Sequence, residues 1–187
     1  MAQVRALTAA LENSPKLNDI NTSLDNVSQM SDFSAIELKI KQTKYFDRLN
    51  LLTNLSTSQK QGYEQRIFSA QTDQTLQAII DEATLQNKKE DLYRIIDQIT
   101  YPTPNSSQAR SSLSKLRTRI NGITTDQEFT QERTTLIEFK TALENKVRKA
   151  NELTYPTRNA LAKSEIITGI NSSTTVAELN RILPDSW

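Results

Sequence analysis

The sequence predicts an all-α protein of tandem three-helix bundles that share long connecting helices and form an elongated rod. Three observations support this fold class. The 187 residues include only 3 Gly and 5 Pro, so the chain lacks the turn residues that β-rich folds need. Apolar residues recur at helical spacing, and clusters of Ser, Thr and Asp separate the apolar stripes. A pair of apolar residues nine positions apart also occurs four times along the chain.

Start and stop signals predict nine helices. Ser, Thr or Asp side chains precede most apolar stripes, where their oxygens can accept the free N–H groups of a new helix. Pro follows such a residue at several of these starts and fits the first helical turn. The predicted helices are 2–13, 15–29, 32–53, 57–70, 73–100, 104–121, 126–154, 157–170 and 175–183.

Particular residues define several of these ends. Thr103-Pro104 predicts the start of the sixth helix, with Thr103 as its N-cap. Thr125 with Glu128 has capping-box spacing, as does Thr175 with Glu178. Gly122 and Gly169 lie near the ends of short helices, so both are predicted to cap a helix C-terminus. These glycines offer no phosphate-binding loop.

Two of the predicted helices are long and carry an interrupted stripe. In 73–100 an apolar stripe begins at Leu76, polar residues intervene at Gln86–Asp91, and a second stripe begins at Leu92. In 126–154, Phe129 and Leu136 precede a later stripe that begins at Phe139, and no Pro or Gly ends the helix. At 1.5 Å per residue each would be about 40 Å long. Both are therefore predicted to connect one bundle to the next.

The nine-residue pair marks the repeat. Its copies are Val27 and Ile36, Ile67 and Leu76, Ile120 and Phe129, and Ile170 and Leu179. The first members of successive pairs are 40, 53 and 50 residues apart, from 67−27, 120−67 and 170−120, which is the range of helical repeat units. Two short antiparallel helices expose an apolar face that a third helix can cover. Units that share this third helix would stack end to end.

The second copy carries the pattern Y…I..A.T…L.AIIDE. The residues in that order are Tyr63, Ile67, Ala70, Thr72, Leu76, Ala78, Ile79, Ile80, Asp81 and Glu82. This stretch resembles the GA module, the protein G-related albumin-binding module, a three-helix domain of bacterial surface proteins. The other copies resemble diverged GA-like and FIVAR-type units of giant matrix-binding surface proteins. The predicted domains are a diverged GA-like unit at 1–53, the best match at 45–100, a GA-like or FIVAR-like unit at 88–154, and a C-terminal GA-like unit at 140–187.

The resemblance also implies a binding surface. In albumin-binding members, the second helix, the following loop and the start of the third helix contact the ligand. The corresponding residues are Tyr63, Arg66, Ile67, Ala70, Thr72, Leu76 and Ile79. The chain departs from some binding modules at Thr75, where they have Gly, and in the segment STSQKQG at 56–62. From helical spacing alone, Ile67, Leu76 and Ile79 are core residues, which leaves Tyr63 and Thr72 as the more telling positions.

Two functions follow from these patterns. The first is a segment of a bacterial cell-surface or secreted protein that binds host serum albumin or an extracellular-matrix protein as a monomer. The second is a structural spacer that holds a distant adhesive domain away from the cell, because repeat packing tolerates sequence drift. No cofactor is predicted for either function.

Composition disfavours the other classes of function. The chain has no Cys and no His, which removes disulfides, thiolate chemistry and the commonest metal ligand and general base. Its carboxylates form no evident acid–base pair, so no enzyme and no metal site are predicted. No run of about 18 apolar residues occurs, so no transmembrane segment is predicted in this chain.

The charge balance disfavours specific nucleic-acid binding. Lys plus Arg number 23 against 22 for Asp plus Glu, a net charge of +1. Arg110, Lys115, Arg117 and Arg119 cluster locally without interleaved aromatic residues. The cluster is interpreted as a solvated helix face, and the alternative is a patch that attracts anionic cell-wall polymers.

Overall fold

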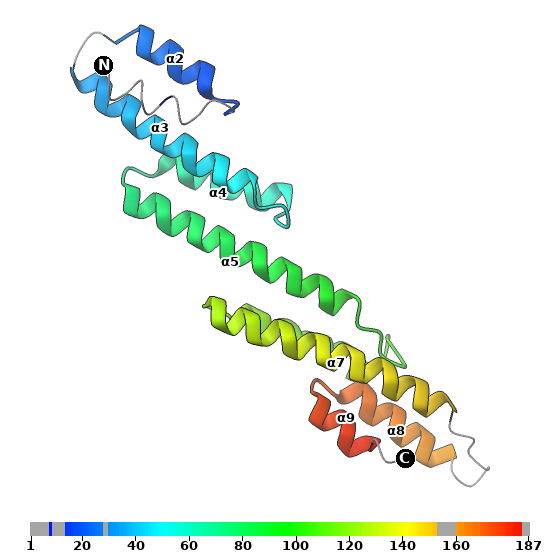
Figure 1. The fold of residues 1–187 in the computed structure, drawn as a ribbon. Coiled ribbons are helices and arrows are strands. Elements are labelled where there is room, and N and C mark those ends of the chain that lie inside the picture. The colour runs from blue at the N-terminus through cyan, green and yellow to red at the C-terminus, as the bar shows by residue number, and fades with distance from the viewer. Residues whose placement is uncertain (1–7, 9–13, 28–29, 153–159, 185–187) are drawn as a thin grey trace. The chain divides into compact units, whose positions relative to one another are not determined.

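The computed structural model describes Thr8 and residues 14–27, 30–152 and 160–184, and all regular structure in these residues is helical. This confirms the predicted all-α class. The predicted helix 2–13 and the predicted start of the helix 157–170 lie outside the described residues, Thr8 apart. The helices, shown in Figure 1, are α2 (Leu17–Asp25), α3 (Met30–Asn50), α4 (Thr57–Ser69), α5 (Asp73–Asp97), α6 (Ser107–Asn121), α7 (Asp126–Glu152), α8 (Ala160–Ser172) and α9 (Val176–Ile182).

The predicted start of α6 is wrong by three residues. The helix begins at Ser107, and its N-cap is Ser106, whose side chain accepts a hydrogen bond from the N–H of Ala109 at 3.1 Å. Thr103 belongs to a preceding turn, in which its carbonyl accepts from the N–H of Ser106 at 3.0 Å. Two Ser or Thr residues compete for the N-cap position here, and the one nearer to the apolar stripe takes it.

Both predicted capping boxes are present. Thr125 Oγ1 accepts from the N–H of Glu128 at 3.2 Å, and the Glu128 carboxylate accepts from the N–H of Thr125 at 3.1 Å. Thr175 and Glu178 exchange the same two bonds at the start of α9. Hydrogen bonds from the backbone N–H groups of the preceding threonines hold the pKa of each glutamate below its usual range. Each box thereby satisfies N–H groups that the helix leaves free.

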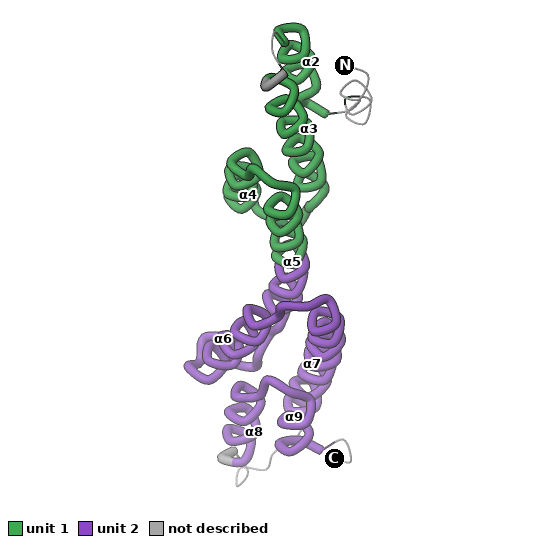
Figure 2. Tube along the Cα trace, turned by 90° about the vertical axis from the view of Figure 1, so that its left-hand side faces the viewer, with its two compact units in different colours: residues 1–87 green, residues 88–187 purple. Residues whose placement is uncertain are grey.

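The chain divides into two compact units, residues 1–87 and residues 88–187, shown in green and purple in Figure 2. The boundary falls inside the polar segment Gln86–Asp91 of α5. Leu76 in the first part of α5 is fully buried in unit 1, and Leu92 in its last part is fully buried in unit 2. One helix therefore supplies both cores. The tandem three-helix arrangement and the four domain ranges stay predictions.

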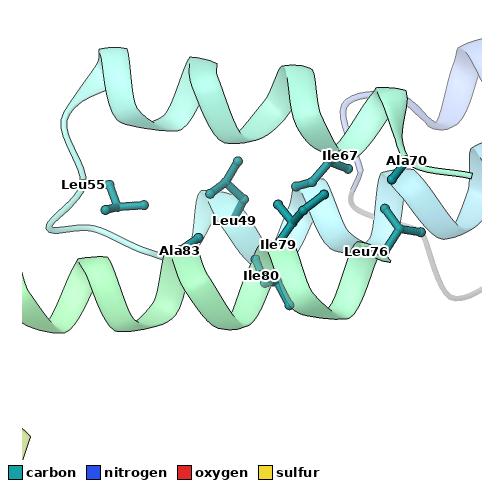
Figure 3. Packing of buried hydrophobic residues seen from close by; sticks show 8 residues of the cluster. All are labelled: Leu49, Leu55, Ile67, Ala70, Leu76, Ile79, Ile80 and Ala83. Atoms are coloured by element: carbon teal, nitrogen blue, oxygen red, sulfur yellow. The ribbon is translucent and has the colours of Figure 1, made fainter. Parts of the chain in front are cut away.

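The core of unit 1 lies where α3, α4 and the first part of α5 meet (Figure 3). Four partly buried side chains pack against it, namely Tyr45, Phe46, Leu52 and Tyr63. A second cluster joins α2 to the first part of α3 through Ile20, Ile36 and Ile40. The buried residues of the main cluster are Leu49, Leu55, Ile67, Ala70, Leu76, Ile79, Ile80 and Ala83.

Unit 2 contains the last part of α5 together with α6, α7, α8 and α9. Helix α8 packs against α6, α7 and α9, and α9 also packs against α7. Phe139 of α7 is fully buried, and its ring centroid lies 6.5 Å from that of Tyr101 in the α5–α6 connection. Among the described residues of this unit, the other buried apolar ones are Leu92, Ile96, Ile99, Ala109, Leu116, Ile120, Ile123, Leu136, Leu143, Ala150, Ile170, Leu179 and Leu183.

Buried polar groups connect the end of α8 and the turn after it to α6 and the α5–α6 connection. The hydroxyl of Tyr101 donates to the carbonyl of Ser173 at 2.6 Å, and burial raises the pKa of this phenol to about 12. Asn171 Oδ1 accepts from the N–H of Thr103 at 3.1 Å, and its carbonyl accepts from Ser112 Oγ at 2.9 Å. The turn after α8 is therefore held against α6 and the α5–α6 connection.

The two glycines predicted as C-caps differ in role. Gly122 is the C-cap of α6, as predicted, and its N–H donates to the carbonyls of Thr118 and Arg119, each at 3.2 Å. The prediction for Gly169 is wrong, because this residue lies inside α8. A Cβ placed there would stand 2.9 Å from Cδ1 of Ile182, so Gly169 allows α8 and α9 to approach closely.

Candidate binding surface on the second helix pair

Hydrogen bonds define the start of α4, the start of α5 and the end of α4. Helix α4 begins with a capping box in which Ser56 and Gln59 are the partners, and α5 begins after Thr72, whose Oγ1 accepts from the N–H of Thr75 at 3.2 Å. From α3, the buried Gln42 donates its Nε2 to the carbonyls of Phe68 at 3.1 Å and Ala70 at 2.9 Å. These bonds occupy carbonyls that the end of α4 would otherwise leave free.

The structure separates the residues suggested by the family resemblance into two groups. Ile67 and Leu76 are fully buried, and Ala70 and Ile79 are 5% and 4% exposed. All four belong to the core of unit 1, visible in Figure 3. Their side chains act on any ligand only by supporting the surface above them. Arg66 and Thr72 are exposed and Tyr63 is half-buried, so these three residues are open to contact.

Tyr63 and Arg66 meet a carboxylate of α5. The Arg66 guanidinium donates to both oxygens of Glu82, at 2.8 and 2.6 Å, and lies 5.3 Å from the centroid of the Tyr63 ring. The Tyr63 hydroxyl donates to Glu82 Oε1 at 3.4 Å. The bonds from Arg66 lower the pKa of Glu82, whereas burial raises the pKa of Tyr63. At neutral pH the cluster presents a fixed guanidinium, a carboxylate and a phenol.

Thr72 and Thr75 complete this surface at the start of α5. Their hydroxyls lie 2.8 Å apart, and both side chains are exposed. We call Tyr63, Arg66, Thr72, Thr75 and Glu82 the α4–α5 face. Among the described residues, the exposed large apolar side chains are Leu51 and Ile137, neither of which belongs to this face. Its chemistry is consequently that of polar and aromatic contacts.

Sequence reasoning missed two residues that organise this surface. Glu82 is part of the quoted family pattern, but its pairing with Arg66 joins positions 16 residues apart and depends on the packing of α4 against α5. Gln42 holds the carbonyl of Ala70 from 28 residues away. No local sequence pattern reports either contact. The role of Gln42 is recognisable from the structure, because a buried Gln side chain is expected to have a hydrogen-bond partner.

The basic cluster of α6 is partly neutralised. Arg117 pairs with Asp97 of α5, and Arg119 pairs with Glu132 of α7. Arg119 also donates to the carbonyl of Thr174 at 3.2 Å. Two of the cluster's cations therefore pair with neighbouring helices inside unit 2.

In the part of the chain that the structure describes, no group of His, Cys, Asp and Glu side chains is arranged to hold a metal ion. No described helix combines the length and apolar character required to cross a bilayer.

Comparison with known proteins identifies the segment that contains the α4–α5 face. Residues 37–89 match the family model of the GA module. This range includes most of α3, all of α4 and the first part of α5. Comparisons with curated proteins and with solved structures found no match. Residues 37–89 are therefore similar to the GA module, which is an albumin-binding domain of bacterial surface proteins.

Proposed function

We propose that residues 37–89 are a non-catalytic binding module of a bacterial cell-surface protein, and that the α4–α5 face binds a host serum protein of the albumin type. The match to the GA module carries this proposal, because the family is one of binding domains. An extracellular-matrix protein is the other host ligand that the sequence suggests. The bound chain is proposed to be monomeric.

The composition of the face supports the proposal. Tyr and Arg are enriched among the residues that dominate protein interfaces, because each combines a large contact area with hydrogen-bond donors. Tyr63 and Arg66 lie one turn apart on α4, and Glu82 holds the Arg66 guanidinium in one orientation. Fixing the side chains before binding reduces the entropy lost when a ligand docks.

The test is binding of the full chain to immobilised serum albumin, with Arg66→Ala compared with Arg48→Ala. Arg48 is a matched control because it is exposed on α3, lies 5.2 Å from the centroid of the Tyr45 ring, and donates to Gln77 of α5 at 3.3 Å. We expect Arg66→Ala to weaken binding about tenfold, as loss of an interface Arg typically does, and Arg48→Ala to leave it unchanged. Equal effects of the two substitutions would place the binding surface elsewhere.

The second candidate function is a structural spacer without a ligand at this face. It is favoured by the burial of Ile67, Ala70, Leu76 and Ile79, which assigns every apolar candidate to the core. It is also favoured by the shared helix α5, whose two ends contribute to different cores. Absence of binding to albumin and to a panel of serum and matrix proteins would leave the spacer as the function of this segment.

A further inference from the structure

The ammonium group of Lys16 lies against the faces of two neighbouring phenylalanine rings in unit 1. Its Nζ is 4.0 Å from the ring centroid of Phe68 and 4.7 Å from that of Phe46, and 3.2 Å from Oε1 of Glu64. The rings lie 5.7 Å apart at an interplanar angle of 47°. The two neighbouring rings and the carboxylate each attract the cation. We call Phe46, Phe68 and Glu64 the ammonium cage.

The cage is built by the GA module and filled from outside it. Phe46 belongs to α3, while Glu64 and Phe68 lie one turn apart on α4, and all three fall within residues 37–89. Lys16 precedes α2 and is 48 residues from Glu64 in sequence. The nearby Ser14 Oγ donates to Asp47 at 3.1 Å, which also joins this segment to α3. The occupant and the walls therefore come from different parts of the chain.

The walls of the cage have support that is independent of Lys16. Phe46 packs against the core of unit 1, and the carbonyl of Phe68 accepts a hydrogen bond from the buried Gln42. The side chains of Lys16 and Glu64 are 30% and 37% exposed, so the cage is open to solvent on one side. We therefore expect the cage to keep its shape when Lys16 leaves and an external cation to reach it from the open side.

We propose that the ammonium cage is a binding site for a primary alkylammonium group, which Lys16 fills in the free chain and a lysine side chain of a partner protein fills in exchange. A primary ammonium fits because its N–H groups can donate to Glu64 while its charge lies over both rings. A quaternary ammonium has no N–H to donate. This site uses residues outside the α4–α5 face, so it does not depend on the proposed albumin contact.

The test uses the full chain with Lys16→Ala, which empties the cage. Adding n-butylammonium chloride, a mimic of the lysine side chain, should produce saturable NMR shifts of the Phe46 and Phe68 ring protons. The unsubstituted chain should need at least about twofold more of the amine for half-saturation, because the tethered Lys16 competes for the same site. Linear, unsaturated shifts in Lys16→Ala would overturn the proposal.

Three controls define the specificity of the site. Lys60→Ala is a control that removes a different lysine of unit 1, whose Nζ donates to the carbonyl of Asn50 at 3.2 Å. This variant should respond to the amine like the unsubstituted chain. Adding Glu64→Gln to Lys16→Ala should weaken the response at least about threefold, because the ammonium loses its charged acceptor. Tetramethylammonium chloride should shift the rings less than n-butylammonium does, and an equal response to both would overturn the assignment to a primary amine.

A final comparison separates this proposal from the albumin contact. Helical circular dichroism of Lys16→Ala and its thermal melting should show that the variant remains folded. Albumin binding by Lys16→Ala should equal that of the unsubstituted chain, since the α4–α5 face is unchanged. If Lys16→Ala binds albumin normally but shows no saturable response to n-butylammonium, the proposed ammonium site is refuted and the proposed albumin contact is not.

Discussion

Gly62 and Gly169 both lie inside helices, but their surroundings differ. A Cβ at Gly62 of α4 would meet no atom within 4 Å, whereas a Cβ at Gly169 of α8 would stand 2.9 to 3.1 Å from three atoms of Ile182. Alanine gains about 1 kcal/mol over glycine in a helix interior through its lower backbone entropy. At Gly169 this gain is opposed by the cost of overpacking, about 1–3 kcal/mol, against a β-branched side chain with few rotamers.

We therefore expect the two alanine substitutions to act in opposite directions. Gly62→Ala should raise the free energy of unfolding by about 0.5–1 kcal/mol, and Gly169→Ala should lower it by about 1 kcal/mol. Urea denaturation followed by circular dichroism measures both changes. An equal increase in both variants would show that Ile182 moves aside without cost and that Gly169 has no packing role.

At the scale of the element, α5 is the helix with two separate environments. Its residues Leu76 and Leu92 are both fully buried, but the first packs with Leu49 and Ile67 of α3 and α4. The last part of α5 instead contacts α6 through the Arg117–Asp97 pair, and Asp91, at the end of the polar segment, pairs with Arg133 of α7 at 3.2 Å. The polar segment Gln86–Asp91 separates the two parts, so we expect a substitution in either part to act mainly within the unit of that part.

Hydrogen exchange can test this division of α5. Leu76→Ala and Leu92→Ala should each lower the free energy of unfolding by about 2–5 kcal/mol, because apolar burial is lost and a cavity is left behind. Leu76→Ala should raise amide exchange mainly in α3 and α4, and Leu92→Ala mainly in α6 and α7. Exchange that rises equally in all these helices after either substitution would mean that the two cores unfold as one.

At the scale of the whole molecule, the prediction of a rod rests on the sequence. The apolar stripes of the long helices are interrupted by polar residues and not by Pro or Gly, which favours continuous helices that join successive units. Small-angle X-ray scattering tests this prediction, because a compact chain of 187 residues should have a radius of gyration of about 16 Å. We expect a clearly larger value, and one near 16 Å would refute the rod.

The sequence was sufficient where the controlling contacts are local. The helix class and most of the helix ends followed from apolar periodicity and from caps such as Thr175 with Glu178, whose partners are three residues apart. The second copy of the repeat was recognisable as GA-like because its pattern lies within one continuous stretch. The start of α6 was missed because Thr103 and Ser106 are both good N-caps, and Thr103 is instead engaged with Asn171.

The tertiary structure decided what depends on distant partners. It placed Ala70 in the core, paired Arg66 with Glu82, and brought Lys16 into the ammonium cage. The sequence by itself determined the helices and the family of one module, because backbone hydrogen bonding and capping act over a few residues. Only the tertiary structure decided which side chains remain available to a ligand, because burial depends on helices that meet across tens of residues of chain.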